Sequence, residues 1–345
     1  MRDDPAVIPP DSEDRASPDS EPGAGTRPVR VLAAGGTIAM RGEQAVPALD
    51  AAELVQQLPQ VAGFHLEAET VLSLPSTHLT LADALGLARR AGEAASSGEG
   101  VVLTTGTDTM EEVAMVCALT YGGQAPIVVT GANRPGSAPG ADGPANLLDA
   151  IILARAPAAA GLGVVVAFGG EVHAASTVRK IDSTGPVAFG SPTAGPLGRI
   201  VEGRVWLHAT PRRPGPIDVR SLDHRVSTVS TGLGDDGALL RRAAEMSDGV
   251  VLVALGAGHL SPVVLSELRH AAERVPVLIT CRPDRSSMLF STYGFEGAER
   301  DLRASGAICV PFLSAPAARV ALLCALGAGL DRADMQVAFA PFDAH

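Results

Sequence analysis

Short runs of apolar residues alternate with longer segments of helical periodicity along most of this 345-residue chain. Each run is rich in valine, isoleucine or leucine and nearly continuous in its apolarity, which is typical of strands covered on both faces. The runs expected to form strands are Val29–Ala34, Gly100–Leu103, Pro126–Thr130, Gly163–Phe168, Val250–Leu255, Pro276–Ile279 and Ala307–Val310. The segments expected to form helices are Leu79–Ala95, Met110–Tyr121, Gly143–Arg155, Pro262–Ala272 and Pro316–Leu326. The alternation predicts an α/β fold, with a three-layer, mostly parallel sheet in an N-terminal domain and a smaller α/β C-terminal domain.

The length suggests about two domains, at roughly 150 residues each. The segment at 210–216 reads TPRRPGP and is a poor helix and a poor strand. We therefore expect a catalytic domain over 28–210, a linker over 211–222 and a C-terminal domain over 223–345. Residues 1–27 hold seven acidic and three basic residues with few large aliphatic ones. This composition predicts a disordered acidic tail.

Composition excludes several classes of protein. The net charge of −11 argues against a nucleic-acid-binding protein, because a phosphate backbone is bound by clustered lysines and arginines. Only 3% of the residues are aromatic, which excludes an aromatic platform for stacking single-stranded bases. The longest apolar stretch, Ala150–Gly170, is interrupted by an arginine, a proline and glycines, so no membrane span is predicted. Because the N-terminal residues lack a secretory pattern, we expect a cytoplasmic protein. We expect no metal site and buried free thiols at the four cysteines, which are Cys117, Cys281, Cys309 and Cys324.

Two glycine–threonine turns follow predicted strands. Ala34–Ala39 reads AGGTIA, where the Thr37 hydroxyl could act as a nucleophile, although a simple turn with a capping threonine also explains the motif. Thr104–Glu112 reads TTGTDTMEE, and there a Thr or Asp is expected to cap the next helix while Glu111 and Glu112 complement its dipole. Because ligands of α/β folds bind beyond the carboxyl ends of strands, the two turns predict one cleft.

A glycine-rich loop and a lysine complete the pattern. Gly131–Leu147 reads GANRPGSAPGADGPANL and is expected to shape a loop and to cap a helix at Asp142. Lys180 lies among polar residues and by itself would be interpreted as a surface charge. Together, GGTIA, TTGTDTMEE, this loop and the lysine resemble the bacterial-type L-asparaginase/glutaminase family in order and spacing, from about Val29 onward. The YGF segment at Tyr293–Phe295 also resembles the C-terminal domain of that family.

The resemblance implies an amidohydrolase that converts the side-chain amide of L-asparagine, or also of L-glutamine, to the acid and ammonia through a threonine acyl-enzyme. It implies no cofactor. The catalytic residues that it implies are Thr37, Thr107, Asp108 and Lys180, and the substrate-binding residues are Ser76, Thr77 and Asp108.

In this interpretation Thr37 is the nucleophile, and Lys180 helps the hydroxyl of Thr107 to handle a proton. Asp108 binds the α-amino group of the substrate, and Ser76 binds its α-carboxylate. The family also implies a homo-oligomer, a tetramer built from close dimers or a dimer, whose small-molecule substrate is an amino-acid amide.

The chain departs from the family pattern at three places. The lid segment Met40–Pro47 is short and has no tyrosine, so Arg41 or Glu43 is a candidate substitute for that residue. Thr77 stands where many members have a glutamine. Members of the family often lend an acid of the C-terminal domain to a neighbouring subunit. The corresponding segment here, Arg282–Leu289, is shortened, and Asp284 is its only acid.

Other interpretations stay open. The lid without a tyrosine favours a non-catalytic or altered-specificity relative that binds an amino acid or a related amide. The amidase subunit that supplies ammonia for transfer-RNA amidation carries a sizeable N-terminal domain, which the short acidic tail does not resemble. Gly256–Gly258 follows a strand as Gly-x-Gly, but the third glycine of a dinucleotide-binding motif is absent. His259, which follows it, is interpreted as a loop residue that could touch a neighbouring subunit's site.

Overall fold

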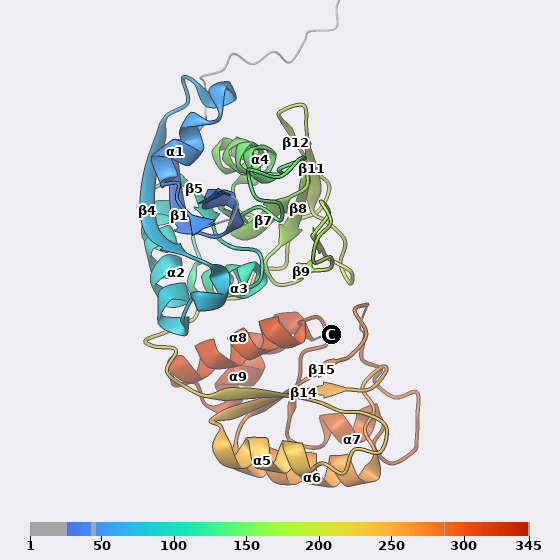
Figure 1. Ribbon diagram of the computed structural model, residues 1–345. Coiled ribbons are helices and arrows are strands. Elements are labelled where there is room, and N and C mark those ends of the chain that lie inside the picture. Colours follow the sequence, from blue (N-terminus) through green and yellow to red (C-terminus); the bar gives the residue numbers. More distant parts are fainter. Residues whose placement is uncertain (1–25, 43–45, 286, 344–345) are drawn as a thin grey trace, which may run out of the picture.

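The computed structural model describes residues 26–42, 46–285 and 287–343, and it confirms the expected α/β architecture (Figure 1). An eight-stranded mixed sheet forms the N-terminal part, and a four-stranded parallel sheet forms the C-terminal part. The predicted acidic tail lies outside the described residues except for Thr26 and Arg27. Within the described ranges, no helix combines the length and the apolarity needed to cross a bilayer.

The large sheet is parallel over the five strands β4, β1, β5, β6 and β7 and antiparallel beyond β7. Its order is β12-β11-β8-β7-β6-β5-β1-β4, and neighbouring strands are parallel from β4 to β7. The pairs β7–β8, β8–β11 and β11–β12 are antiparallel. The strands are β1 (Val29–Gly35), β4 (Leu66–Leu74), β5 (Gly100–Thr104), β6 (Ile127–Thr130), β7 (Val164–Phe168), β8 (Glu171–Ala174), β11 (Gly198–Val201) and β12 (Arg204–Leu207). Two small hairpins accompany the sheet, and they pair β2 (Met40–Arg41) with β3 (Val46–Pro47) and β9 (Arg179–Lys180) with β10 (Phe189–Gly190).

Helices cover both faces of this sheet, which gives the three expected layers (Figure 1). One face carries α2 (Leu81–Ser96) and α3 (Met110–Thr120), and the other carries α1 (Ala51–Gln56) and α4 (Gly143–Arg155). Because successive strand residues point to opposite faces, Leu32 of β1 joins the core beneath α2 and α3, while its neighbour Val31 joins the core beneath α4. The single-turn 3₁₀ segments are η1 (Thr37–Ala39), η2 (Pro59–Val61), η3 (Ser76–His78), η4 (Pro157–Ala159) and η5 (Ala340–Phe342).

The C-terminal sheet has the order β13-β14-β15-β16 and is parallel throughout. Its strands are β13 (Val226–Ser230), β14 (Gly249–Ala254), β15 (Val277–Cys281) and β16 (Ile308–Cys309), and its helices are α5 (Ala238–Met246), α6 (Pro262–Arg274), α7 (Glu299–Arg303), α8 (Ala315–Gly327) and α9 (Arg332–Phe339). In Figure 1, α8 lies between this sheet and α3, so one buried cluster continues from the N-terminal core into the C-terminal one. All four cysteines are buried free thiols.

The connection between β12 and β13 has no helix or strand over residues 208–225. The linker expected at 211–222 falls in this connection, and part of it is packed against the protein. Ile217 is buried, and its N–H donates to the carbonyl of Leu119 at 2.6 Å. Arg89 of α2 donates to the carbonyls of Val219 and Arg220. The connection therefore also joins the two sheets through contacts of its own.

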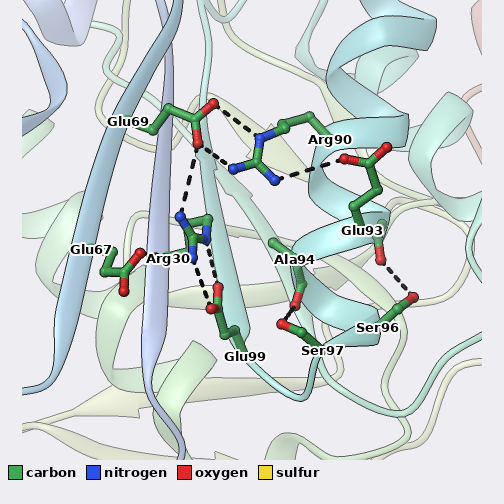
Figure 2. A network of polar contacts seen from close by, with 10 residues as sticks. Arg30, Glu67, Glu69, Arg90, Glu93, Ala94, Ser96, Ser97 and Glu99 are labelled. Carbon is green, nitrogen blue, oxygen red and sulfur yellow. Dashed lines mark hydrogen bonds and ion pairs between the residues drawn. The ribbon is translucent and has the colours of Figure 1, made fainter.

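An ion-pair network fastens the edge strand β4 to the sheet and to α2 (Figure 2). The guanidinium of Arg30 donates two hydrogen bonds to Glu99, at 2.6 and 2.9 Å, and lies 2.7 Å from a carboxylate oxygen of Glu67. Arg90 donates to Glu69 of β4. These hydrogen bonds from Arg30 and Arg90 hold the pKa values of Glu99 and Glu69 below their ordinary range. A charged edge of this kind also discourages pairing with the strands of other molecules.

Replacing Arg30→Met is expected to lower the free energy of unfolding by about 2 kcal/mol at pH 7, because it leaves partly buried carboxylates without their cation. Glu99 and Glu69 have lowered pKa values, so their stabilising effect is present above about pH 4.5 and is lost as the pH falls through their folded pKa values. Urea unfolding at pH 7 and pH 3 measures both effects. Glu93→Gln is the control, since this exposed residue meets Arg90 only at 3.8 Å and should cost less than about 0.5 kcal/mol. Equal losses in the two variants would contradict the assignment.

Candidate active site

Three turns meet beyond the carboxyl ends of β1, β4 and β5. Gly36, with φ at +78°, approaches the second turn so closely that a Cβ on it would lie 2.3 Å from the nitrogen of Gly106. A Cβ on Gly106 would in turn lie 2.6 Å from the hydroxyl of Ser76. Side chains do not fit at such distances, so both positions require glycine. The two glycines thus allow the turns that carry Thr37, Ser76 and Thr107 to pack backbone against backbone.

These turns line an open cavity of about 190 Å³. Its wall is mostly polar and consists of Gly36, Thr37, Met40, Pro75, Ser76, Thr77, Gly106, Thr107, Asp108, Asn133, Lys180 and Ser183. Every residue assigned to catalysis or substrate binding from the sequence lies in this wall. Asn133 and Ser183 are further lining residues that the sequence analysis did not single out. Asn133 stands inside the quoted loop motif, whereas Ser183 follows Lys180 without a distinguishing pattern.

The β9–β10 hairpin brings Lys180 to the turn after β5. Its Nζ donates to Oγ1 of Thr107 at 2.8 Å and to Oδ1 of Asp108 at 2.7 Å. Thr107 is buried and the Lys180 side chain is only 19% exposed, whereas the Asp108 side chain is 59% exposed and faces the opening. The ammonium thus joins a buried hydroxyl to a carboxylate that can reach a solute.

Lys180 is also the only lysine among the 345 residues, and the other basic side chains are 26 arginines. Arginine matches lysine in charge but keeps its proton at any ordinary pH, whereas an amine can release and accept one. The use of arginine everywhere else therefore sets Lys180 apart as the one side chain of this charge that could exchange a proton. This count is the signal that could have distinguished Lys180 from a surface charge.

Two acids in the first turn of α3 are less exposed than the sequence interpretation implies. Oε2 of Glu111 accepts the backbone N–H of Lys180 at 3.3 Å, and burial raises the pKa of this carboxyl to about 7. Burial also raises the pKa of Glu112, which lies 3.5 Å from Arg319 of α8. Besides complementing the helix dipole, each of the two acids therefore makes a contact with a distant part of the chain.

Capping was predicted wrongly at two positions. Asp142 precedes α4 but makes no side-chain cap; its carboxylate instead accepts the backbone N–H groups of Asn133 and Arg134. Thr109 precedes α3, also without a side-chain cap, and donates to the carbonyl of Ser76 at 3.2 Å. In both cases the polar side chain holds another loop of the site in place, a role that depends on tertiary contacts.

The backbone donors of the turns are partly engaged. The N–H of Gly36 donates to the carbonyl of Leu74 at 3.0 Å, and the N–H of Thr105 donates to the carbonyl of Thr130 at 3.0 Å. A developing oxyanion therefore needs other donors from these turns.

Neither Arg41, a candidate substitute for the missing lid tyrosine, nor either tyrosine of the chain lines the cavity. Met40 of β2 lines the cavity, but the guanidinium of Arg41 donates to Oε1 of Gln57 at 2.6 Å. Glu43 lies outside the described residues. The hydroxyl of Tyr121 donates to the carbonyl of Ala125, and Tyr293 packs edge-on against His259 in the C-terminal domain. Neither tyrosine is part of the cavity wall.

The acid of the shortened C-terminal region faces the N-terminal domain of its own chain. Oδ1 of Asp284 lies 2.7 Å from Nη1 of Arg179, the residue before Lys180. Its carbonyl accepts the hydroxyl of Thr193 at 3.1 Å. The C-terminal domain thereby holds the hairpin that carries Lys180.

Both parts of the chain match models of known protein families. Residues 28–213 match the family model described as asparaginase, N-terminal, and residues 225–339 match the glutaminase/asparaginase C-terminal domain. The chain belongs to the asparaginase family. Its relatives include a probable L-asparaginase of Deinococcus radiodurans, 36% identical over 88% of this chain and 94% of that protein. L-asparaginase 2 of Escherichia coli is 31% identical over 90% of this chain and 92% of its own length.

A solved structure agrees with the sequence relatives. The probable cytoplasmic L-asparaginase of Campylobacter jejuni superposes with a TM-score of 0.78 at 29% identity, and the match covers 91% of this chain and 99% of that one. The likeness extends over both sheets, so the family resemblance of the motifs is confirmed for the whole described fold.

Proposed function

We propose that this asparaginase-family protein hydrolyses the side-chain amide of L-asparagine to L-aspartate and ammonia, with L-glutamine as the longer competing substrate. The observation that carries the proposal is the contact of Lys180 Nζ with both Thr107 and Asp108 in a cavity that Thr37 also lines. This set provides a nucleophile, a proton carrier and a charged anchor for a free amino acid. The family names of the relatives agree with it.

Thr37 is the nucleophile of the proposed reaction. Its oxygen adds to the amide carbon, and the C–N bond then breaks, so that nitrogen leaves as ammonia with the proton that the hydroxyl gave up. The ester on Thr37 is hydrolysed by water, which returns a proton to the threonine oxygen and releases the acid. The N–H of Gly36 already donates to the carbonyl of Leu74. Other backbone N–H groups of the turns would therefore stabilise the oxyanion of each tetrahedral intermediate.

Lys180 and Thr107 carry protons in this scheme. In the proposed scheme the ammonium of Lys180, held by Asp108 at 2.7 Å, first gives up a proton to solvent, and the amine then accepts one through the hydroxyl of Thr107. The same carboxylate, exposed at the opening, binds the α-ammonium of the substrate. Ser76 and Thr77, which line the same cavity, donate to the α-carboxylate.

The direct test is ammonia release by the purified protein from L-asparagine, L-glutamine and D-asparagine, with aspartate or glutamate quantified in parallel. We expect equal amounts of ammonia and acid, and the largest kcat/KM for L-asparagine. If L-asparagine raises the melting temperature but no ammonia appears, the protein binds amino acids without hydrolysing them and the proposal is wrong.

We further propose a cytoplasmic homo-oligomer. The structural relative from Campylobacter jejuni carries the word cytoplasmic in its name, which supports this location. Light scattering at micromolar concentration measures the assembly, and a monomer would contradict the oligomer.

A further inference from the structure

Helix α3 holds Lys180 at two points. The turn that precedes the helix supplies Thr107 and Asp108, which receive the Nζ hydrogen bonds. The first turn of the helix supplies Glu111, whose Oε2 accepts the backbone N–H of the same lysine at 3.3 Å. The backbone of Lys180 is thus held by the first turn of α3, and its side-chain end by the turn that precedes the helix. The hairpin itself is held by the pairing of β9 with β10, by the N–H of Ile181, which donates to the carbonyl of Ala188 at 2.8 Å, and by the ion pair of Arg179 with Asp284.

The carboxyl of Glu111 changes its charge near neutral pH. Burial raises its pKa to about 7, and the nearby acid Glu112 acts in the same direction. Arg179 and Lys180, on β9, favour the anion and offset part of this effect.

The neighbouring charges are themselves paired. Arg179 lies 2.7 Å from Asp284 of the C-terminal domain, and Glu112 lies 3.5 Å from Arg319 of α8. Within the described part of the chain no cation forms an ion pair with Glu111, and the backbone N–H of Lys180 is the donor that its oxygen meets.

We propose that Glu111 is a positioning residue for the amide hydrolysis put forward above, and that its ionised carboxylate fixes the backbone of Lys180 so that Nζ spans Thr107 and Asp108. An anionic acceptor forms a stronger hydrogen bond to an N–H than a neutral one does. When Glu111 is protonated, the lysine backbone is held less firmly and Nζ is less often in place. The inference rests on the proposed function but concerns a residue outside the cavity wall.

Kinetics over a range of pH test the inference. In the wild type, kcat should rise about threefold to tenfold between pH 6 and pH 8 as Glu111 ionises. Glu111→Gln keeps an oxygen that accepts the N–H but cannot ionise, so its kcat should lack this rise. Glu111→Leu removes the acceptor and should lower kcat about tenfold or more with KM changed less than about threefold, because the substrate anchors remain. Partial rescue by glutamine over leucine separates positioning from a general loss of structure.

The matched control is Glu112→Gln, which changes the next acid of the same helical turn. Its carboxylate meets Arg319 rather than β9, so this variant should keep a rise of kcat with pH, with the midpoint moved slightly lower because Glu112 no longer raises the pKa of Glu111. A Glu111→Gln enzyme with the wild-type pH profile, or a Glu111→Leu enzyme with wild-type kcat, would overturn the proposal.

A measurement independent of activity is available because the chain has a single lysine. Protein labelled with ¹⁵N-lysine should give one backbone amide signal, that of Lys180. Its chemical shift should titrate with a midpoint near pH 7 in the wild type and at a slightly lower pH in Glu112→Gln, but should not titrate in Glu111→Gln. If this titration is seen while no amide is hydrolysed, the contact stands and the proposed function fails. If amides are hydrolysed but the titration and the kinetic differences are missing, only the role of Glu111 is wrong.

Discussion

Thr37→Ala is expected to reduce ammonia release from L-asparagine at least about a thousandfold, because it removes the oxygen that would form the acyl-enzyme. The side chain is small and lies at the cavity wall, so the fold should be retained. Steady-state release of ammonia measures the loss, and circular dichroism checks the structure. A residual rate from the remaining donors and from substrate binding is expected.

Two further variants make this result specific. Thr37→Ser keeps a hydroxyl and should retain far more activity than Thr37→Ala. Mass spectrometry of acid-quenched wild-type enzyme should detect an acyl adduct on the peptide that contains Thr37, and the alanine variant should show none. An adduct on Thr107 instead, or full activity of Thr37→Ala, would move the nucleophile to the second turn.

The second large effect is expected for Lys180→Arg, which should lower kcat by about a hundredfold to ten-thousandfold. Arginine keeps the positive charge beside Thr107 and Asp108 but cannot give up a proton at ordinary pH. The loss therefore isolates proton transfer from charge. The measurement is kcat for L-asparagine between pH 6 and pH 9.

A comparison with Lys180→Gln completes the test. If proton transfer dominates, arginine and glutamine should cost similar factors in kcat. If Lys180→Arg stays within about threefold of the wild type, the site needs only a cation there, and the role assigned to the amine is wrong.

The buried strands could be predicted from the sequence because their apolar runs are continuous. β1, β5, β7 and β14 lie within one residue of the expected bounds, and α4 spans Gly143–Arg155 as predicted. The edge strand β4 was missed because none of its residues is fully buried and polar ones are interspersed, as in LEAETVLSL. The antiparallel strands β8, β11 and β12 were missed since each has only four residues, and β11 and β12 are also partly exposed. The sheet is consequently less uniformly parallel than expected.

The members of the site could be predicted from motifs, but their surroundings could not. All the assigned residues meet in one cavity, since strand ends of a parallel sheet share an edge. The behaviour of Glu111 depends instead on β9 folding over α3. That contact joins residues 69 positions apart, and no local spacing encodes it. Asp142 was likewise expected to cap α4. Its carboxylate instead accepts the N–H groups of Asn133 and Arg134 in the preceding loop, a contact that no local spacing encodes.

The single lysine also determines how the protein can be handled chemically. Reagents that attack primary amines, such as succinimidyl esters and aldehydes on solid supports, find only Lys180 and the N-terminal amine. Lys180 is therefore the one side chain that these routes can modify, and its modification would fall in the candidate active site. Attachment through an added cysteine is the safer choice, because the four native thiols are buried and would react slowly.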